Sequence, residues 1–328
     1  MLSLFYMFAC TDAQLGVAYK EEFLPAIDIH LHTGEWEDIP SESQDYLSSR
    51  FPFPFGLTAD SLAEDTLSSE GIVRELDKGG LNLGVLLAVY APRSVGVTRN
   101  DFVIQEIEKT DRLYGMASLS VEQWSSVKED QLDVLRSKLD HPKMIGVKLA
   151  HTHMHFRMDD PAYYPIYEIA AETNAPVYVH TGSSPFPGTT PDAPYTDPRY
   201  LEEAIVRHPD TQFVLGHMCY NFIEETASDM DNCFSLAANH SNVWLEPSAL
   251  GSRSLELVKT VYQKAQEFDV VDKMIYGSDG PQFPGFVDRY VDLNAQAMEE
   301  VGYTVEEAAA VLSGNAVRAY GIPELELE

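Results

Sequence analysis

Short apolar runs alternate with longer helix-like segments through the whole sequence, and this alternation limits the fold more than any other feature. Eight runs have the length and residue types of strands: 26–29, 83–89, 114–119, 144–149, 176–179, 212–215, 243–245 and 274–276. Eight successive β–α units favour a closed parallel barrel over an open sheet. A chain of 328 residues also suits such a barrel, which takes about 250 residues plus insertions. We therefore predict an α/β protein built as a single (β/α)8 TIM barrel.

The residues before the first strand form a separate region. Residues 2–9 are almost wholly apolar, Cys10 follows them, and a polar stretch covers residues 11–22. This order resembles the end of a bacterial lipoprotein signal with Cys10 as the lipidated residue, although the basic start of such signals is missing. The alternative is an irregular apolar arm that packs on the barrel. We therefore predict an N-terminal arm or truncated signal over 1–22 and the barrel over 23–328, in the cytoplasm or in the cell envelope.

The composition restricts the partners. Acidic residues outnumber basic residues by 52 to 22, which gives a net charge of -30. Such a field repels polyanions, so we expect no nucleic-acid partner and a small molecule as substrate. No apolar run is long enough to span a membrane as a helix.

The three cysteines, Cys10, Cys219 and Cys233, include no Cys-x-x-Cys pair. Their number and spacing indicate neither a disulfide framework nor a zinc–thiolate site. We therefore expect Cys219, which lies two residues after His217, to be a buried structural thiol.

Residues that can ligate a metal or move a proton end several of the predicted strands. His30 and His32 end the first strand and point to the same side, with Cα atoms about 6.6 Å apart, so both imidazoles can converge on one ion. His180 directly follows the run 176–179, and His217 and Asp279 lie two and three residues after the runs 212–215 and 274–276. The carboxyl ends of barrel strands meet at one rim, where active sites lie. Two long segments that follow strands, residues 33–58 and 181–198, are predicted to be lids or binding loops there.

The order of these motifs resembles the amidohydrolase superfamily. It is most similar to the amidohydrolase-related (amidohydrolase 2) branch, which includes metal-dependent hydrolases and aminocarboxymuconate-semialdehyde-type decarboxylases. The resemblance runs from residue 25 to residue 322. The segments that carry it are Asp28-x-His30-x-His32, 146–149, 160–168, 176–182, Gly216-His217, 276–279 and 314–321.

The resemblance implies a set of metal ligands, namely His30, His32, His180 and Asp279. Three imidazoles and one carboxylate suit a single divalent ion, most simply zinc, with manganese as the alternative. His217 is then an unligated histidine that orients or protonates the substrate, and Asp279 also serves as a catalytic proton acceptor.

Lys148 and the segment after it are predicted to bind substrate. In some branches of the superfamily a carboxylated lysine bridges two metals, whereas one metal is usual in this branch. The resemblance therefore implies an uncarboxylated Lys148 that contacts substrate or a buried acid, and we add His151 and Arg157 as further substrate-binding residues. Relatives of this kind are commonly dimers, so a homodimer is an expectation as well.

Three functions fit these residues. We favour a metal-dependent hydrolase of an amide, ester or lactone that uses an activated water. A non-oxidative decarboxylase on the same site is the alternative, but it needs a well-defined cation near the metal, and Arg157 is only a loop candidate. A non-catalytic binding barrel is a remote third function, since it predicts a missing ligand and every expected position is filled.

Overall fold

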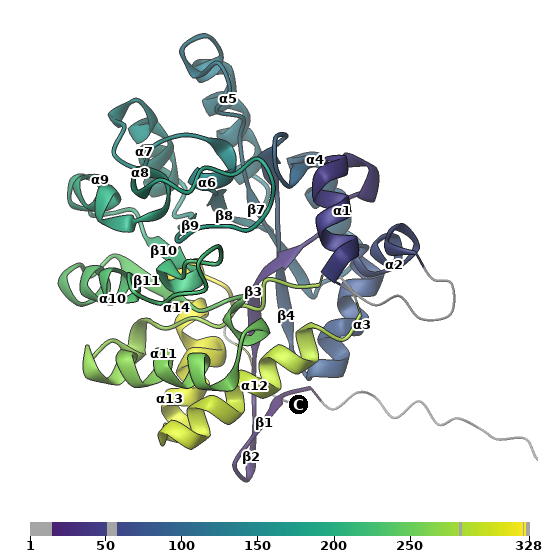
Figure 1. Ribbon diagram of the computed structural model, residues 1–328, viewed down its shortest axis with the longest axis vertical. Helices are drawn as coiled ribbons and strands as arrows, with labels where there is room; N and C mark the ends of the chain where they lie inside the picture. The colour runs from purple at the N-terminus through teal and green to yellow at the C-terminus, as the bar shows by residue number, and fades with distance from the viewer. Residues whose placement is uncertain (1–14, 51–57, 282–283, 324, 326–328) are drawn as a thin grey trace, which may run out of the picture.

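The computed structural model describes residues 15–50, 58–281, 284–323 and 325. Its centre is a curled, seven-stranded parallel sheet with helices arranged around it (Figure 1). In spatial order the strands are β11 (Val243–Glu246), β10 (Phe213–Gly216), β9 (Val177–His180), β8 (Met144–Leu149), β7 (Leu113–Ala117), β4 (Leu83–Leu87) and β3 (Ile27–His32). Every residue of β9 and β10 is buried, as expected for strands covered on both faces.

The helices follow the strands as the alternation predicts. They are α1 (Ser41–Arg50), α2 (Ala59–Thr66), α3 (Ser69–Gly79), α4 (Asn100–Ile107), α5 (Trp124–Leu139), α6 (His151–Met154), α7 (Tyr164–Glu172), α8 (Ala193–Thr196), α9 (Glu202–Arg207), α10 (Met230–Asn239), α11 (Leu255–Glu267), α12 (Val287–Val301), α13 (Val305–Ala309) and α14 (Asn315–Tyr320). The segment after β3, expected to be a loop, thus contains α1. A small antiparallel pair, β5 (Val89–Ala91) and β6 (Gly96–Thr98), follows β4.

The predicted eighth strand, residues 274–276, does not form a regular strand. Residues 274–280 make isolated parallel bridges to both edge strands, Leu245 with Met274 and Leu31 with Gly280. The backbone N–H of Ile275 donates to Leu245 O at 2.8 Å, and that of Asp279 donates to the carbonyl of β3 residue His30 at 3.0 Å. Asp279 has a positive φ of 70°, which a pleated strand cannot contain. An irregular segment therefore joins β11 to β3 where an eighth strand was expected.

The N-terminal region differs from the irregular arm that the sequence predicts. β1 (Val17–Tyr19) and β2 (Glu22–Leu24) form an antiparallel hairpin that lies against α12. Tyr19 is buried, and its hydroxyl donates to the carbonyl of Tyr303 at 2.9 Å. The predicted boundary at residue 22 therefore divides a hairpin that belongs to the core. The proposed signal and Cys10 lie outside the described residues.

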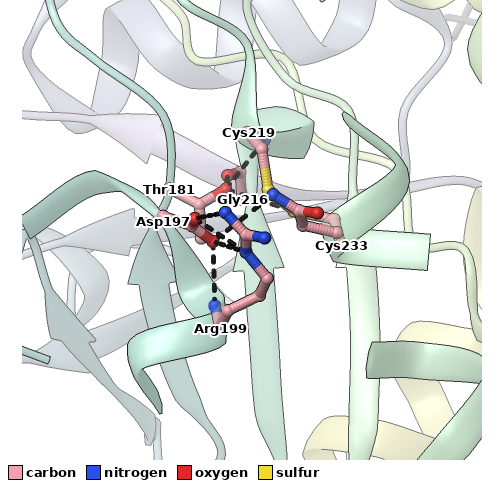
Figure 2. Close-up of a disulfide and its surroundings, with 7 residues drawn as sticks. Thr181, Asp197, Arg199, Gly216, Cys219 and Cys233 are labelled. Atoms are coloured by element: carbon pink, nitrogen blue, oxygen red, sulfur yellow. Dashed lines mark hydrogen bonds and ion pairs between the residues drawn. A yellow bond between two sulfur atoms is a disulfide. The ribbon is translucent and has the colours of Figure 1, made fainter. Parts of the chain in front are cut away.

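The cysteine prediction is wrong. Cys219 and Cys233 are joined in a disulfide (Figure 2). They are 14 residues apart in sequence, but the turn after β10 packs against α10 and brings their Cα atoms to 6.4 Å. Sequence spacing alone does not reveal such packing. No helix in the described part of the chain is long and apolar enough to cross a membrane.

Candidate metal centre

The five residues selected from strand ends lie together at the carboxyl end of the sheet. Asp279 Oδ1 lies 3.0 Å from Nε2 of His32 and 3.1 Å from Nε2 of His30. The ring of His217 lies 4.2 Å from that of His180 and 5.1 Å from that of His30, measured between centroids. Residues separated by up to 249 positions thus form one cluster, because the curled sheet brings the ends of its strands together.

The cluster fits a metal ion by the chemistry of its donors. His30, His217 and Asp279 offer ligand atoms that all lie within 4.8 Å of one another. Nε2 of His180 is buried and has no hydrogen-bond partner among the described residues. A buried polar atom without a partner is costly, and a bound cation would remove that cost. His217 belongs to this group of three possible ligands. The assignment of His217 as an unligated residue therefore stays a prediction.

Burial and neighbouring charges set the protonation of this cluster. Burial holds the pKa of His180 well below its usual range and lowers that of His217 to about 4, so both imidazoles are neutral, the form that binds metal. Burial disfavours the charged form of Asp279, but His30 and the hydrogen bonds from His30 and His32 outweigh it and hold its pKa well below the usual range. The site therefore combines the neutral imidazoles of His180 and His217 with the ionised carboxylate of Asp279.

A buried polar layer lies beneath the cluster and fixes His30. Nδ1 of His30 lies 2.9 Å from the hydroxyl of Tyr178 and 3.0 Å from Oγ of Ser248. The Tyr178 hydroxyl in turn donates to Glu246 at 2.8 Å, and Asp28 accepts the backbone N–H groups of His30 and Ser278 at 3.0 Å each. Such contacts orient a ligand and select its tautomer.

Sequence reasoning missed one member of this layer and left two unassigned. Tyr178 was not selected, although it precedes His180 by two residues and so faces the same side of β9. Glu246 ends β11 and Ser248 lies two residues beyond it, and neither was given a role from the sequence. Nothing in their local sequence distinguishes them from ordinary strand-end residues.

A cavity of about 390 Å³ opens above the cluster. Of the predicted substrate-binding residues, Lys148 lines it, with Nζ 3.4 Å from Nε2 of His30. Burial lowers the pKa of Lys148 to about 7. His153 also lines the cavity, and its Nδ1 lies 2.9 Å from Oγ of Ser94. The rest of the lining includes the aromatic residues Trp36, Tyr46, Phe186 and Phe222 and the cations Arg50, Arg253 and Arg289.

Two predicted substrate-binding residues do not line the cavity. His151 is fully buried and packs on Phe156, with ring centroids 4.1 Å apart. Arg157 is exposed and binds Asp159 through two hydrogen bonds of 2.8 and 2.6 Å. His151 lies in the short helix α6 and Arg157 lies three residues beyond that helix, an arrangement that the spacing of the residues did not indicate.

The profile of the amidohydrolase family matches residues 27–322. The chain belongs to the amidohydrolase family. Amidohydrolases are enzymes and are generally metal-dependent, so the family agrees with the cluster of imidazoles and carboxylate at the strand ends. No curated protein matches the sequence.

Solved structures share the fold of this amidohydrolase at low sequence identity. An uncharacterised TIM-barrel protein from Bordetella bronchiseptica has a TM-score of 0.66 and 18% identity, covering 91% of this chain and 99% of that one. A probable 2-pyrone-4,6-dicarboxylic acid hydrolase from Acinetobacter baumannii has a TM-score of 0.60 and 18% identity, covering 91% and 100%. A 2,6-dihydroxybenzoate decarboxylase from Rhizobium has a TM-score of 0.61 and 14% identity, covering 91% and 98%. At these identities the likeness establishes the fold alone.

Proposed function

We propose that this amidohydrolase cleaves an amide, ester or lactone bond of a small molecule with a metal-activated water. The observation that carries the proposal is the position of Asp279, whose Oδ1 lies within 3.1 Å of two imidazoles in the same cavity as His217. His30, His32, His180 and Asp279 would hold one divalent ion, most simply zinc, with manganese as the alternative. When bound, such an ion would lower the pKa of a water to about 7 and polarise the substrate oxygen.

The remaining steps belong to residues of this chain. The carboxylate of Asp279 accepts the proton of the attacking water and later returns it to the leaving group. His217 donates a hydrogen bond to the oxygen on which negative charge develops. Ser248 Oγ lies 2.9 Å from Nδ1 of His217, so Nε2 is the ring nitrogen that can serve the substrate. Water and acyl compound thus give an acid and an alcohol or amine.

The charges of the cavity support hydrolysis over decarboxylation. A decarboxylase has to hold the carboxylate that it removes, and a permanent cation next to the metal is the simplest means. Arg157 does not line the cavity, and burial lowers the pKa of Lys148 to about 7, so only about half of it is charged at neutral pH. Of the arginines that line the cavity, Arg253 is paired with Glu225 at 2.7 Å, and Arg50 and Arg289 are exposed. Hydrolysis needs only the activated water, Asp279 and His217.

Decarboxylation remains the second candidate because of one observation. Lys148 Nζ lies 3.4 Å from His30 Nε2 and could hold a carboxylate at the metal whenever it is protonated. A solved structure of the same fold is a 2,6-dihydroxybenzoate decarboxylase.

The test begins with metal analysis of protein purified without chelator, for which we expect one divalent ion per chain. The protein is then incubated in ¹⁸O-water or in deuterium oxide with esters, lactones, amides and carboxylic acids. Hydrolysis places ¹⁸O in the acid product. Release of carbon dioxide, with deuterium on the product carbon and no ester, lactone or amide cleaved, would refute the proposal. Protein that binds no metal and converts none of the compounds would instead indicate a binding barrel.

A further inference from the structure

His217 lies in a turn with an unusual backbone. His217, Met218 and Cys219 have φ values of 64°, 53° and 56°, and none of them is glycine. Single non-glycine residues rarely adopt the left-handed region, and three in succession need strong support from their surroundings. Such conformations gather at functional sites. The side chain that this turn presents to the cavity is that of His217.

Two contacts hold the last residue of this turn. Cys219 is joined through its disulfide to Cys233 of α10, and its backbone N–H donates to Oγ1 of Thr181 at 2.9 Å (Figure 2). The Thr181 hydroxyl donates to the carbonyl of Gly216 at 2.6 Å. These contacts therefore fix the backbone on both sides of His217.

The disulfide and the Thr181 hydroxyl, which we call the clamp, lie in the interior of the protein. Cys233 and Thr181 are fully buried, and Cys219 is 3% exposed. The disulfide links α10, which contributes nothing to the cavity lining, to a position two residues from His217. A purely stabilising crosslink has no need to end beside a catalytic residue, so the location points to a role in placing that residue.

We propose that the Cys219–Cys233 disulfide, together with the hydroxyl of Thr181, positions His217 for catalysis. The inference rests on the proposed function, in which His217 serves the developing oxyanion. Neither cysteine lines the cavity. Both act through the backbone of the turn, which sets where the imidazole lies relative to the cavity.

The first test replaces both cysteines, Cys219→Ser with Cys233→Ser, in the full chain. A displacement of about 1 Å in a catalytic group costs up to roughly 100-fold in rate, so we expect kcat to fall by roughly 10- to 100-fold. We expect KM and metal content to stay close to wild type. In hydrogen–deuterium exchange, the amides of residues 217–220 should exchange faster than in the wild type, whatever the substrate. Cys10→Ser, which removes the third cysteine, should change neither kcat nor exchange.

A second pair of variants tests the clamp if the double variant does not fold. Thr181→Val removes the hydroxyl and should lower kcat and speed exchange of the Cys219 amide, whereas Thr181→Ser should restore both. Unchanged kcat, or loss of the metal in the double variant, would overturn the positioning role. If the wild type converts none of the compounds, the proposed function fails, but the exchange comparison still tests the clamp. Exchange at residues 217–220 that is the same in the variants as in the wild type would then overturn the clamp.

Discussion

The floor and the mouth of the cavity are built in different ways. The floor consists of strand-end side chains such as His30, His180 and Lys148, which are at most 8% exposed and lie among fixed polar neighbours. The mouth includes Arg50 and Arg289, exposed side chains that stack over Tyr46 and Phe286 at 5.0 and 5.3 Å. A buried floor can hold charges and tautomers constant for chemistry, whereas a solvated mouth can adapt to a substrate. Changes in the floor should therefore alter kcat and metal binding, and changes in the mouth should alter KM.

The largest effect should follow Asp279→Asn. It removes both a predicted ligand and the proton acceptor, so kcat should fall by about 10⁴-fold, the upper end of what a proton-transfer group contributes. Metal content, measured by elemental analysis, should fall as well. Removing the metal from the wild type with a chelator should abolish turnover, and zinc or manganese should restore it. A variant that keeps most of its activity would show that the chemistry does not depend on this part of the floor.

His217→Asn should produce the next largest effect. We expect kcat to fall by roughly 10²- to 10⁴-fold with the metal retained, since the group acts on the oxyanion outside the predicted ligand set. Steady-state kinetics and metal analysis of the same preparation provide the comparison. Loss of the metal would make His217 a ligand, an outcome that its place beside His30 and Asp279 allows.

Tyr178→Phe tests whether the layer beneath the site supports the metal. The variant loses the hydroxyl that contacts both His30 and Glu246, and the metal affinity should fall by roughly 10- to 100-fold. Competition with a chelator measures that affinity. Tyr320→Phe is a matched control because the Tyr320 hydroxyl is buried with no hydrogen-bond partner in the described part of the chain. Equal metal affinities of Tyr178→Phe and Tyr320→Phe would show that the polar layer does not support the metal.

Arg289→Gln tests the mouth. With an acidic substrate we expect KM to rise by roughly 10-fold and kcat to stay the same, because the guanidinium attracts a charge remote from the reacting bond. Arg157→Gln, which alters a residue outside the cavity, should change neither constant. A change in kcat for Arg289→Gln would mean that mouth and floor are not separate.

The smallest effect should follow a change in the β1–β2 hairpin, which lies outside both the floor and the mouth of the cavity. Tyr19→Phe removes the hydrogen bond to the Tyr303 carbonyl and should lower the free energy of unfolding by about 1 kcal/mol, measured by urea denaturation. Turnover should not change, because the β1–β2 hairpin contributes no residue to the cavity. A loss of turnover at unchanged stability would contradict this separation.

The local parts of this protein could be predicted from the sequence. Apolar runs and helical patterns identified seven strands of the sheet. The spacing of His30 and His32 placed two imidazoles on one face, since side chains alternate along a strand. The other strand-end residues, His180, His217 and Asp279, were selected because parallel strands end at one rim. Each of these inferences needs only a local period or the general architecture of the fold.

Tertiary structure decided the features that depend on how distant segments meet. An irregular segment, in which Asp279 has a positive φ, lies where an eighth strand was expected. His151 lies in helix α6 and does not line the cavity. Packing of the turn after β10 on α10 paired Cys219 with Cys233. Sequence periodicity specifies which side of its own element a residue faces. Contacts between elements depend on the packing and closure of the whole sheet, which no local pattern encodes.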